Sequence, residues 1–108
     1  TTTVKPTTTT TVAGDRVAPV ISGLTARSVT ATAATITWTT NEASDSLVEY
    51  WPSGGAVRTA SNATRVTAHS VPISGLPRYT TYTVRVKSKD AAGNMATSAT
   101  MTFRTSYF

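Results

Sequence analysis

The side chains able to carry acid–base or metal chemistry are few and widely spaced in this sequence. His69 is the single histidine, and the absence of cysteine excludes disulfides, thiolate catalysis and cysteine–zinc sites. The five carboxylates lack the spacing of a metal-ligand set or of an acid/base pair. They are Asp15, Glu42, Asp45, Glu49 and Asp90. We therefore expect no catalytic residue, no metal site and no cofactor.

Serine and glycine also fail to form a motif typical of enzymes. The sequence has no Gly-x-Ser-x-Gly turn, no second histidine for a hydrolase triad, and no glycine-rich phosphate loop. Glu42 and Asp45 flank a polar stretch that favours a turn. His69 shares its parity with Val71 and Ile73, so we predict a structural or surface histidine. The sequence thus predicts that the chain is not an enzyme.

Charge and hydrophobicity limit the kinds of partner that this chain can bind. Its 108 residues are the length of one domain. The net charge is +5, yet the basic residues are scattered singly apart from Arg85, Lys87 and Lys89. Without a basic cluster or a known module, we expect no nucleic-acid binding. No run of 18 apolar residues occurs, so we expect no membrane insertion.

Residues 1–14, TTTVKPTTTTTVAG, are low in complexity, and eight of the first eleven residues are threonine. Two interpretations stay open. The stretch is an extended linker of the O-glycosylated stalk type, or it is an added strand on the open sheet edge of a neighbour, anchored by Val4 and Val12. We divide the chain into three parts. The Thr-rich segment covers residues 1–16, a β-domain covers 17–106, and the C-terminal end is 107–108. Because the chain starts at Thr and opens on no signal sequence, we expect a mature or excised piece.

The clearest element is a two-faced strand within 76–94. Tyr82, Val84 and Val86 alternate with Arg85 and Lys87, so one face is apolar and the other cationic. Similar short stretches occur near 20–24, 34–40, 46–51, 56–67, 66–73 and 98–105. With turn signals between them and no helical pattern, they predict an all-β, seven-stranded antiparallel sandwich.

Trp38 is expected to dominate the core, together with Ala34 and Ile36 on the same face of its strand. Burying a tryptophan removes about 150–250 Å² from water, which is roughly 4–6 kcal/mol gross as an upper bound. By the same parity, inward positions on other strands are Val48, Tyr50, Val71 and Ile73.

Three motifs resemble the fibronectin type III domain, an immunoglobulin-like sandwich, over residues 17–105. ATITW (34–38) has a tryptophan on the second strand. LPRYTTY (76–82) is similar to the family's entry to its sixth strand, with the proline one place early. KDAAGN (89–94) resembles the next turn in microbial extracellular members. The resemblance implies that Tyr82 is the tyrosine corner, its hydroxyl bonded to backbone near Leu76 and Pro77. The predicted structural core is Trp38, Tyr82, Ile36, Val84, Val86 and Leu76.

Trp51 is the main candidate for a surface contact. It faces outward beside the cationic strand, so Trp51, Arg85 and Lys87 could contact a partner protein or a glycan. The alternative is cover by the same chain, through Pro52 and the following connection. Glu49 is expected to pair with Arg85 or Lys87.

Asn62 begins an Asn-Ala-Thr glycosylation sequon in a stretch predicted to be a polar loop.

Tyr107 and Phe108 lie past the last predicted strand, and three interpretations stay open. The two aromatic residues pack back on the sandwich, they dock on a neighbouring molecule, or they mark the place where a longer chain was cut.

The resemblance and the composition lead to a prediction of function. We expect a non-catalytic extracellular or cell-surface structural module: a spacer, adhesion or assembly element. It is a candidate repeating filament subunit whose N-terminal segment contacts other copies of itself. The alternative is a carbohydrate-binding or accessory module of a secreted polysaccharide-degrading enzyme, with polysaccharide as its partner.

Overall fold

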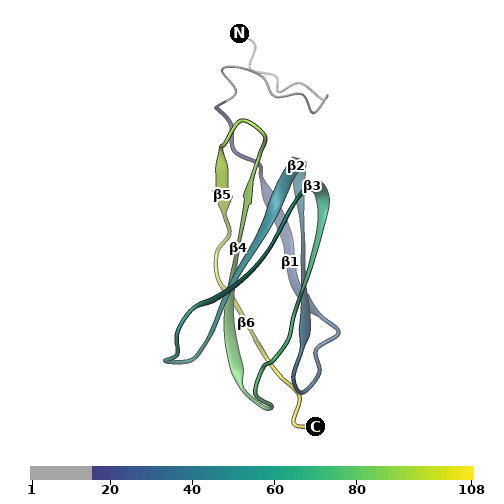
Figure 1. Ribbon diagram of the computed structural model, residues 1–108, viewed down its shortest axis with the longest axis vertical. Coiled ribbons are helices and arrows are strands. Elements are labelled where there is room, and N and C mark those ends of the chain that lie inside the picture. Colours follow the sequence, from purple (N-terminus) through teal and green to yellow (C-terminus); the bar gives the residue numbers. More distant parts are fainter. Residues whose placement is uncertain (1–15) are drawn as a thin grey trace.

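The computed structural model describes residues 16–108, which fold into six β-strands (Figure 1). The predicted anchors Val4 and Val12 lie outside the described residues. The strands are β1 (Ile21–Arg27), β2 (Ala34–Pro52), β3 (Arg58–Ile73), β4 (Thr81–Lys89), β5 (Met95–Thr97) and β6 (Met101–Arg104). Within residues 16–108, no helix has the length and apolarity needed to cross a membrane.

The strands form two facing layers, and β2 and β3 each run through both. One layer contains β1, the first part of β2 and the last part of β3; Ile36 lies opposite Ala26 and Val71. The other contains the remainder of β2 and β3 with β4, β5 and β6; Val48 lies opposite Val86. The pairings given for the described strands are antiparallel, so the predicted fold class is confirmed.

The predicted turn at 41–45 is wrong, because these residues continue β2 from one layer into the other. The stretch has no glycine or proline to reverse the chain. Its polar side chains instead satisfy neighbouring backbone: Val20 N donates to Asn41 Oδ1 at 2.8 Å and Lys89 N donates to Asp45 Oδ1 at 2.8 Å. Register shifts around Ser44 absorb the bend.

Two further strand boundaries differ from the prediction. The stretches 56–67 and 66–73 merge into the single strand β3, so Asn62 lies in a strand and not in a loop. The last predicted strand is divided into β5 and β6. There Val86 N donates to Ser98 Oγ at 3.0 Å and Ser98 Oγ donates to Ala99 O at 2.8 Å. Because a side chain takes the place of a backbone acceptor, the ladder is interrupted.

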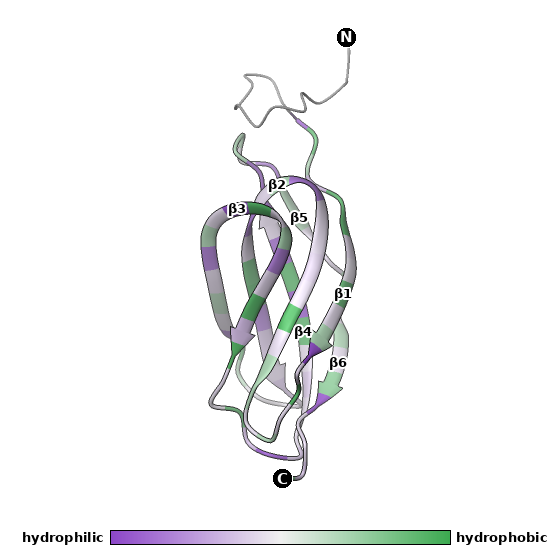
Figure 2. Ribbon diagram, turned by 90° about the vertical axis from the view of Figure 1, so that its right-hand side faces the viewer, coloured by the Kyte–Doolittle hydropathy of each residue, from purple (hydrophilic) through white to green (hydrophobic). Residues whose placement is uncertain are grey.

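The core lies between the two layers. All six residues predicted for the core are buried, with exposed fractions of 3% or less. The alternation of apolar and polar residues that places them there is visible along the strands in Figure 2. Leu24, Met101 and Phe103 pack against the rim of this core.

Thr105 makes the backbone bonds that hold the entry to β4. Its hydroxyl donates to Pro77 O at 2.8 Å and accepts from Thr80 N at 2.8 Å. Within residues 16–108, no hydrogen bond joins the Tyr82 hydroxyl to the backbone near Leu76. The Tyr82 ring packs on Phe103 and Tyr50, each with ring centroids 6.0 Å apart. The expected corner bond of Tyr82 is therefore replaced by the bonds of Thr105.

We expect Thr105→Val to lower the free energy of unfolding by about 1–3 kcal/mol, because the part-buried Pro77 carbonyl and Thr80 N–H both lose their hydroxyl partner. Tyr82→Phe is the matched comparison, and it should cost well under the ~1 kcal/mol of one buried hydrogen bond. Chemical denaturation of both variants measures the difference. A larger loss for Tyr82→Phe than for Thr105→Val would contradict this assignment.

Candidate functional site

The single histidine is buried in the interior of the sandwich. His69 in β3 is opposite Trp38 in β2, and both side chains are 2% exposed. The two rings are stacked, with centroids 4.8 Å apart and planes 3° from parallel. The stacked rings fill space between the layers, so the main role of this pair is packing.

Three hydroxyl groups, of Thr40, Ser44 and Ser46, lie within hydrogen-bonding distance of the imidazole of His69. Thr40 Oγ1 donates to Glu42 O at 2.8 Å, so towards His69 Nε2, also 2.8 Å away, it acts as acceptor. Ser46 Oγ then donates to Nδ1 at 2.7 Å. With the ring proton placed on Nε2, both nitrogens of a neutral imidazole have a hydroxyl partner.

This cluster joins the two layers. Trp38 Nε1, on the first part of β2, donates to Ser88 Oγ on β4 at 2.9 Å. Ser46 pairs with Asn62 and directly precedes the part of β2 that pairs with β4, so its bond to His69 also crosses between layers. Burial lowers the pKa of His69 below its ordinary value, and the charge of Asp45 raises it by a smaller amount. Because both ring nitrogens are engaged, the cluster suits structure rather than catalysis.

No metal centre is built from the described residues: within 16–108, no three histidine or carboxylate side chains gather closely enough to hold an ion. Glu42 and Asp45 are both on the bend of β2, while Asp90 lies in the turn after β4. There Asp90 Oδ1 accepts from Ala92 N at 3.0 Å and from Asn94 N at 2.9 Å. These bonds give Asp90 a structural role, because they stabilise the turn in which Gly93 has a φ of 94°.

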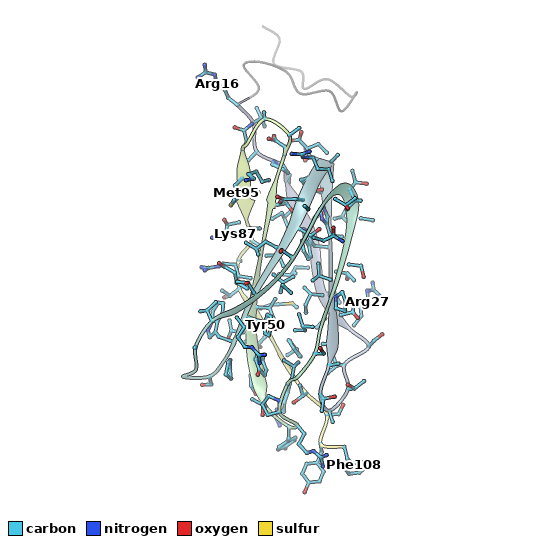
Figure 3. The ribbon with its side chains drawn as sticks, viewed as in Figure 1. Arg16, Arg27, Tyr50, Lys87, Met95 and Phe108 are labelled. Atoms are coloured by element: carbon cyan, nitrogen blue, oxygen red, sulfur yellow. The ribbon has the colours of Figure 1, made fainter. Side chains whose placement is uncertain are left out.

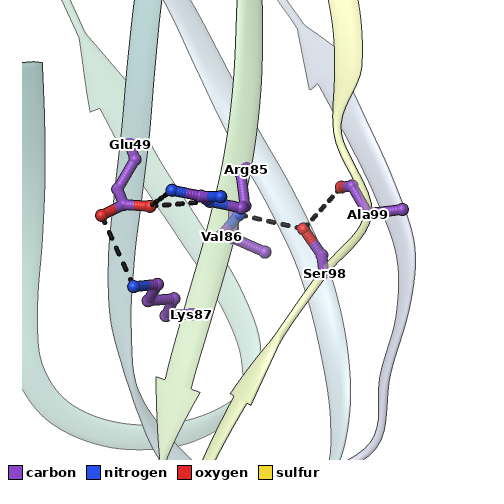
Figure 4. Close-up of polar contacts among 6 residues, drawn as sticks. All are labelled: Glu49, Arg85, Val86, Lys87, Ser98 and Ala99. Carbon is purple, nitrogen blue, oxygen red and sulfur yellow. Dashed lines mark hydrogen bonds and ion pairs between the residues drawn. The ribbon is translucent and has the colours of Figure 1, made fainter. Parts of the chain in front are cut away.

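The outer face of β2 and β4 brings together Arg85 and Lys87, which Figure 4 shows with Glu49, and Trp51. Glu49 Oε1 accepts from Arg85 Nε at 2.8 Å and lies 2.7 Å from Arg85 Nη2, while Lys87 Nζ is 3.6 Å from Glu49 Oε2. The Arg85 guanidinium also lies 5.7 Å from the centre of the Trp51 ring. Glu49 was predicted to pair with Arg85 or Lys87, and it contacts both.

These contacts limit what the outer face can bind. The carboxylate of Glu49 is shared by two cations, and Arg85 lies over Trp51, which is only half-buried. A sugar stacked on that face of the ring would have to displace the guanidinium. An exposed pair of this kind contributes about 0–1 kcal/mol to stability. The role of Trp51, Arg85 and Lys87 in partner or glycan binding stays a prediction.

Asn62 is exposed on β3, opposite Ser46. Its Oδ1 accepts from Thr64 N at 2.9 Å, within the sequon itself. Lys87 and Lys89 share with it the lining of a hollow of about 260 Å³. The side chain is accessible on the surface, and its glycosylation stays a prediction.

Several structural residues were missed from the sequence, although parity could have found some. Ser46 lies on the same strand face as Val48 and Tyr50, and Ser88 on the same face as Val86. The period of two therefore predicts that both serine side chains point inward. Two inward serines on facing strands are a signal for a buried hydrogen-bond network. Tyr79, which has a φ of 54°, carries no such signal in the sequence.

We expect the domain to lose stability on mild acidification because of His69. Burial lowers its pKa in the folded chain below 6.5, so the unfolded chain takes up the proton first. The stabilisation is full above about pH 6.5 and is lost as the pH falls towards the folded pKa, by at most about 1.4 kcal/mol per pH unit.

Denaturation between pH 8 and pH 5 measures this, with His69→Gln as the control that keeps polar atoms but does not titrate. The variant should be less stable at pH 8 and show a flatter profile. Equal slopes for the two proteins would contradict the role of His69.

Comparison with known proteins agrees with this architecture. The family model described as the N-terminal domain of purple acid phosphatase matches residues 19–105. A solved myokine structure is 22% identical, with 84% of this chain and 98% of that chain covered and a TM-score of 0.72. The sensor domain of the anti-sigma factor RsgI4 in Pseudobacteroides cellulosolvens is 22% identical, with 83% and 96% covered and a TM-score of 0.64.

The third fibronectin III domain of the human KIAA0343 protein is 16% identical, with 94% of each chain covered and a TM-score of 0.62. No curated protein matches the chain. The predicted resemblance to fibronectin type III domains is therefore confirmed at the level of the fold. Since the family model spans most of the sequence, the chain belongs to the family of purple acid phosphatase N-terminal domains, which have a fibronectin-like fold.

Proposed function

We propose that the chain is a non-catalytic structural module of an extracellular or cell-surface protein, a spacer or assembly element. The placement of its two ends carries the proposal. Arg16 and Phe108 lie at opposite ends of an elongated sandwich (Figure 3), so the described chain enters at one pole and leaves at the other. A module of that kind adds length between whatever precedes it and whatever follows it.

The chemistry of the described residues supports a non-catalytic role. His69 is enclosed by hydroxyl groups, and Glu49 is held by Arg85 and Lys87. An active site needs a titratable group that is open to a substrate. The fold matches fibronectin type III domains, and similar structures include the sensor domain of an anti-sigma factor and the FN1–FN3 domains of chicken CNTN1. A Thr-rich stretch before the sandwich suits a surface location.

Assembly with other copies is supported by the sheet edges. Among the described strands, β1 and β3 pair with β2 alone, while β5 and β6 pair with β4 alone, so each layer has open edges. An open edge can accept an added strand. Residues 1–14 are rich in threonine, which favours strands, and Val4 and Val12 share a parity. We propose that this segment pairs with an edge of a neighbouring copy.

Removing residues 1–14 should convert a self-associating protein into a monomer without changing its melting temperature. Sedimentation velocity over a range of concentrations measures the association. The double variant Val4→Thr, Val12→Thr is the control for length and composition, and it should weaken association because the apolar anchors are lost. A full chain that is monomeric at every concentration, or a truncated chain that still assembles, would overturn the assembly role.

A second candidate is an accessory module beside a catalytic domain. The description of the matching family, an N-terminal domain of a phosphatase, favours it. A domain of this kind needs no contact with other copies. A chain that stays monomeric with residues 1–14 present would thus favour the accessory role over the assembly role.

A further inference from the structure

Three aromatic side chains are exposed together at the pole where the chain leaves the sandwich. Tyr79, Tyr107 and Phe108 have exposed fractions of 57%, 64% and 89%, and Phe108 is seen at that end in Figure 3. The Tyr79 and Tyr107 rings are 5.5 Å apart at 83°, and the Tyr107 and Phe108 rings are 5.4 Å apart at 66°. We call this group the C-terminal aromatic cluster. Contiguous exposed aromatics on a small domain indicate a contact surface.

Arginine surrounds this cluster, and side-chain carboxylates do not. The Arg104 guanidinium lies 4.8 Å from the centre of the Tyr79 ring, and Arg78 is exposed beside it in the chain. Among residues 16–108, the acidic side chains are in the bend of β2, in the turn after β4, or paired on the outer face. They are Glu42, Asp45, Asp90 and Glu49. This pole therefore offers hydrogen-bond donors and positive charge.

The backbone of Tyr79 adds a second, independent observation. Its φ of 54° lies in the left-handed region, which is unfavourable for a bulky side chain. The conformation is held by a hydrogen bond from Tyr79 N to Ser106 O at 3.0 Å, next to Tyr107. Residues with a strained backbone are concentrated at functional sites, where the surrounding structure holds the side chain in one direction. Here the strain directs the ring towards Arg104 and Tyr107.

We propose that the C-terminal aromatic cluster, with Arg78 and Arg104, binds acidic polysaccharide through its uronic-acid units. The C–H face of a sugar ring packs on the exposed ring of Tyr107 or Phe108, and its carboxylate is matched by the fork of the Arg104 guanidinium, which already lies over Tyr79. The proposed binding site is the same whether the chain is a spacer or an accessory module.

Two other occupants fit the cluster less well. A second copy meeting the same pole would bring arginine against arginine, in a protein of net charge +5. Single-stranded nucleic acid needs ring faces that take successive bases, whereas these rings stand edge to face at 83° and 66°. A single sugar ring needs one aromatic face and the cations beside it.

The test is a titration of the full chain with trigalacturonate, followed by amide NMR shifts, with cellotriose and oligothymidylate as comparison ligands. Trigalacturonate should shift the signals of Tyr79 and of residues 104–108. Tyr79→Asn, which suits a positive φ, should keep the melting temperature and weaken binding roughly tenfold, because Arg104 and Tyr107 lose the ring that positions them. Arg104→Gln should weaken it similarly, and Trp51→Ala should leave it unchanged.

Each opposite result overturns the site. No shift with trigalacturonate, or equal binding by wild type and Tyr79→Asn, leaves only the attraction of a cationic protein for an anion. A loss in Trp51→Ala instead moves the contact to the outer face of β2 and β4. Tighter binding of oligothymidylate, or self-association that Tyr79→Asn abolishes, identifies nucleic acid or a second copy as the occupant.

Discussion

The stack of Trp38 on His69 is the interaction on which the rest of this sandwich depends. The two rings come from neighbouring strands of one layer, yet their polar atoms bond to Ser88 and Ser46 in the other. The cluster therefore fixes the distance and the register between the layers at once. Apolar packing alone is tolerant of sliding, whereas hydrogen bonds buried in a dry interior are costly to break. A neutral imidazole meets both requirements, since it is flat and has one donor and one acceptor.

Alternation along the strands was enough to predict the fold and most of its core. Trp38, Val84 and Val86 are where a period of two places them. Turns were harder, because composition does not separate a reversal from a bend: Asn41 and Asp45 are turn formers that here serve neighbouring backbone. The tyrosine corner came from resemblance, and its bonds are made in this chain by Thr105, far away in sequence.

Surface chemistry was predicted only where partners share a strand face or lie opposite each other. Glu49 and Arg85 are directly opposite in the β2–β4 pairing, so parity and neighbouring strands sufficed. The C-terminal aromatic cluster joins Tyr79 to Tyr107, which are brought together by a loop and a chain end without a periodic pattern. Only the backbone conformation of Tyr79 and the course of the last residues reveal it.

The placement of the two ends also has a consequence for tension applied between the poles. β1 starts near one pole and β6 ends near the other, and both run along the long axis of the domain (Figure 1). A pulling force would slide β1 along β2 and β6 along β4, loading the hydrogen bonds of each ladder together and not one after another. The strand geometry thus places both ladders in shear when the two poles are pulled apart.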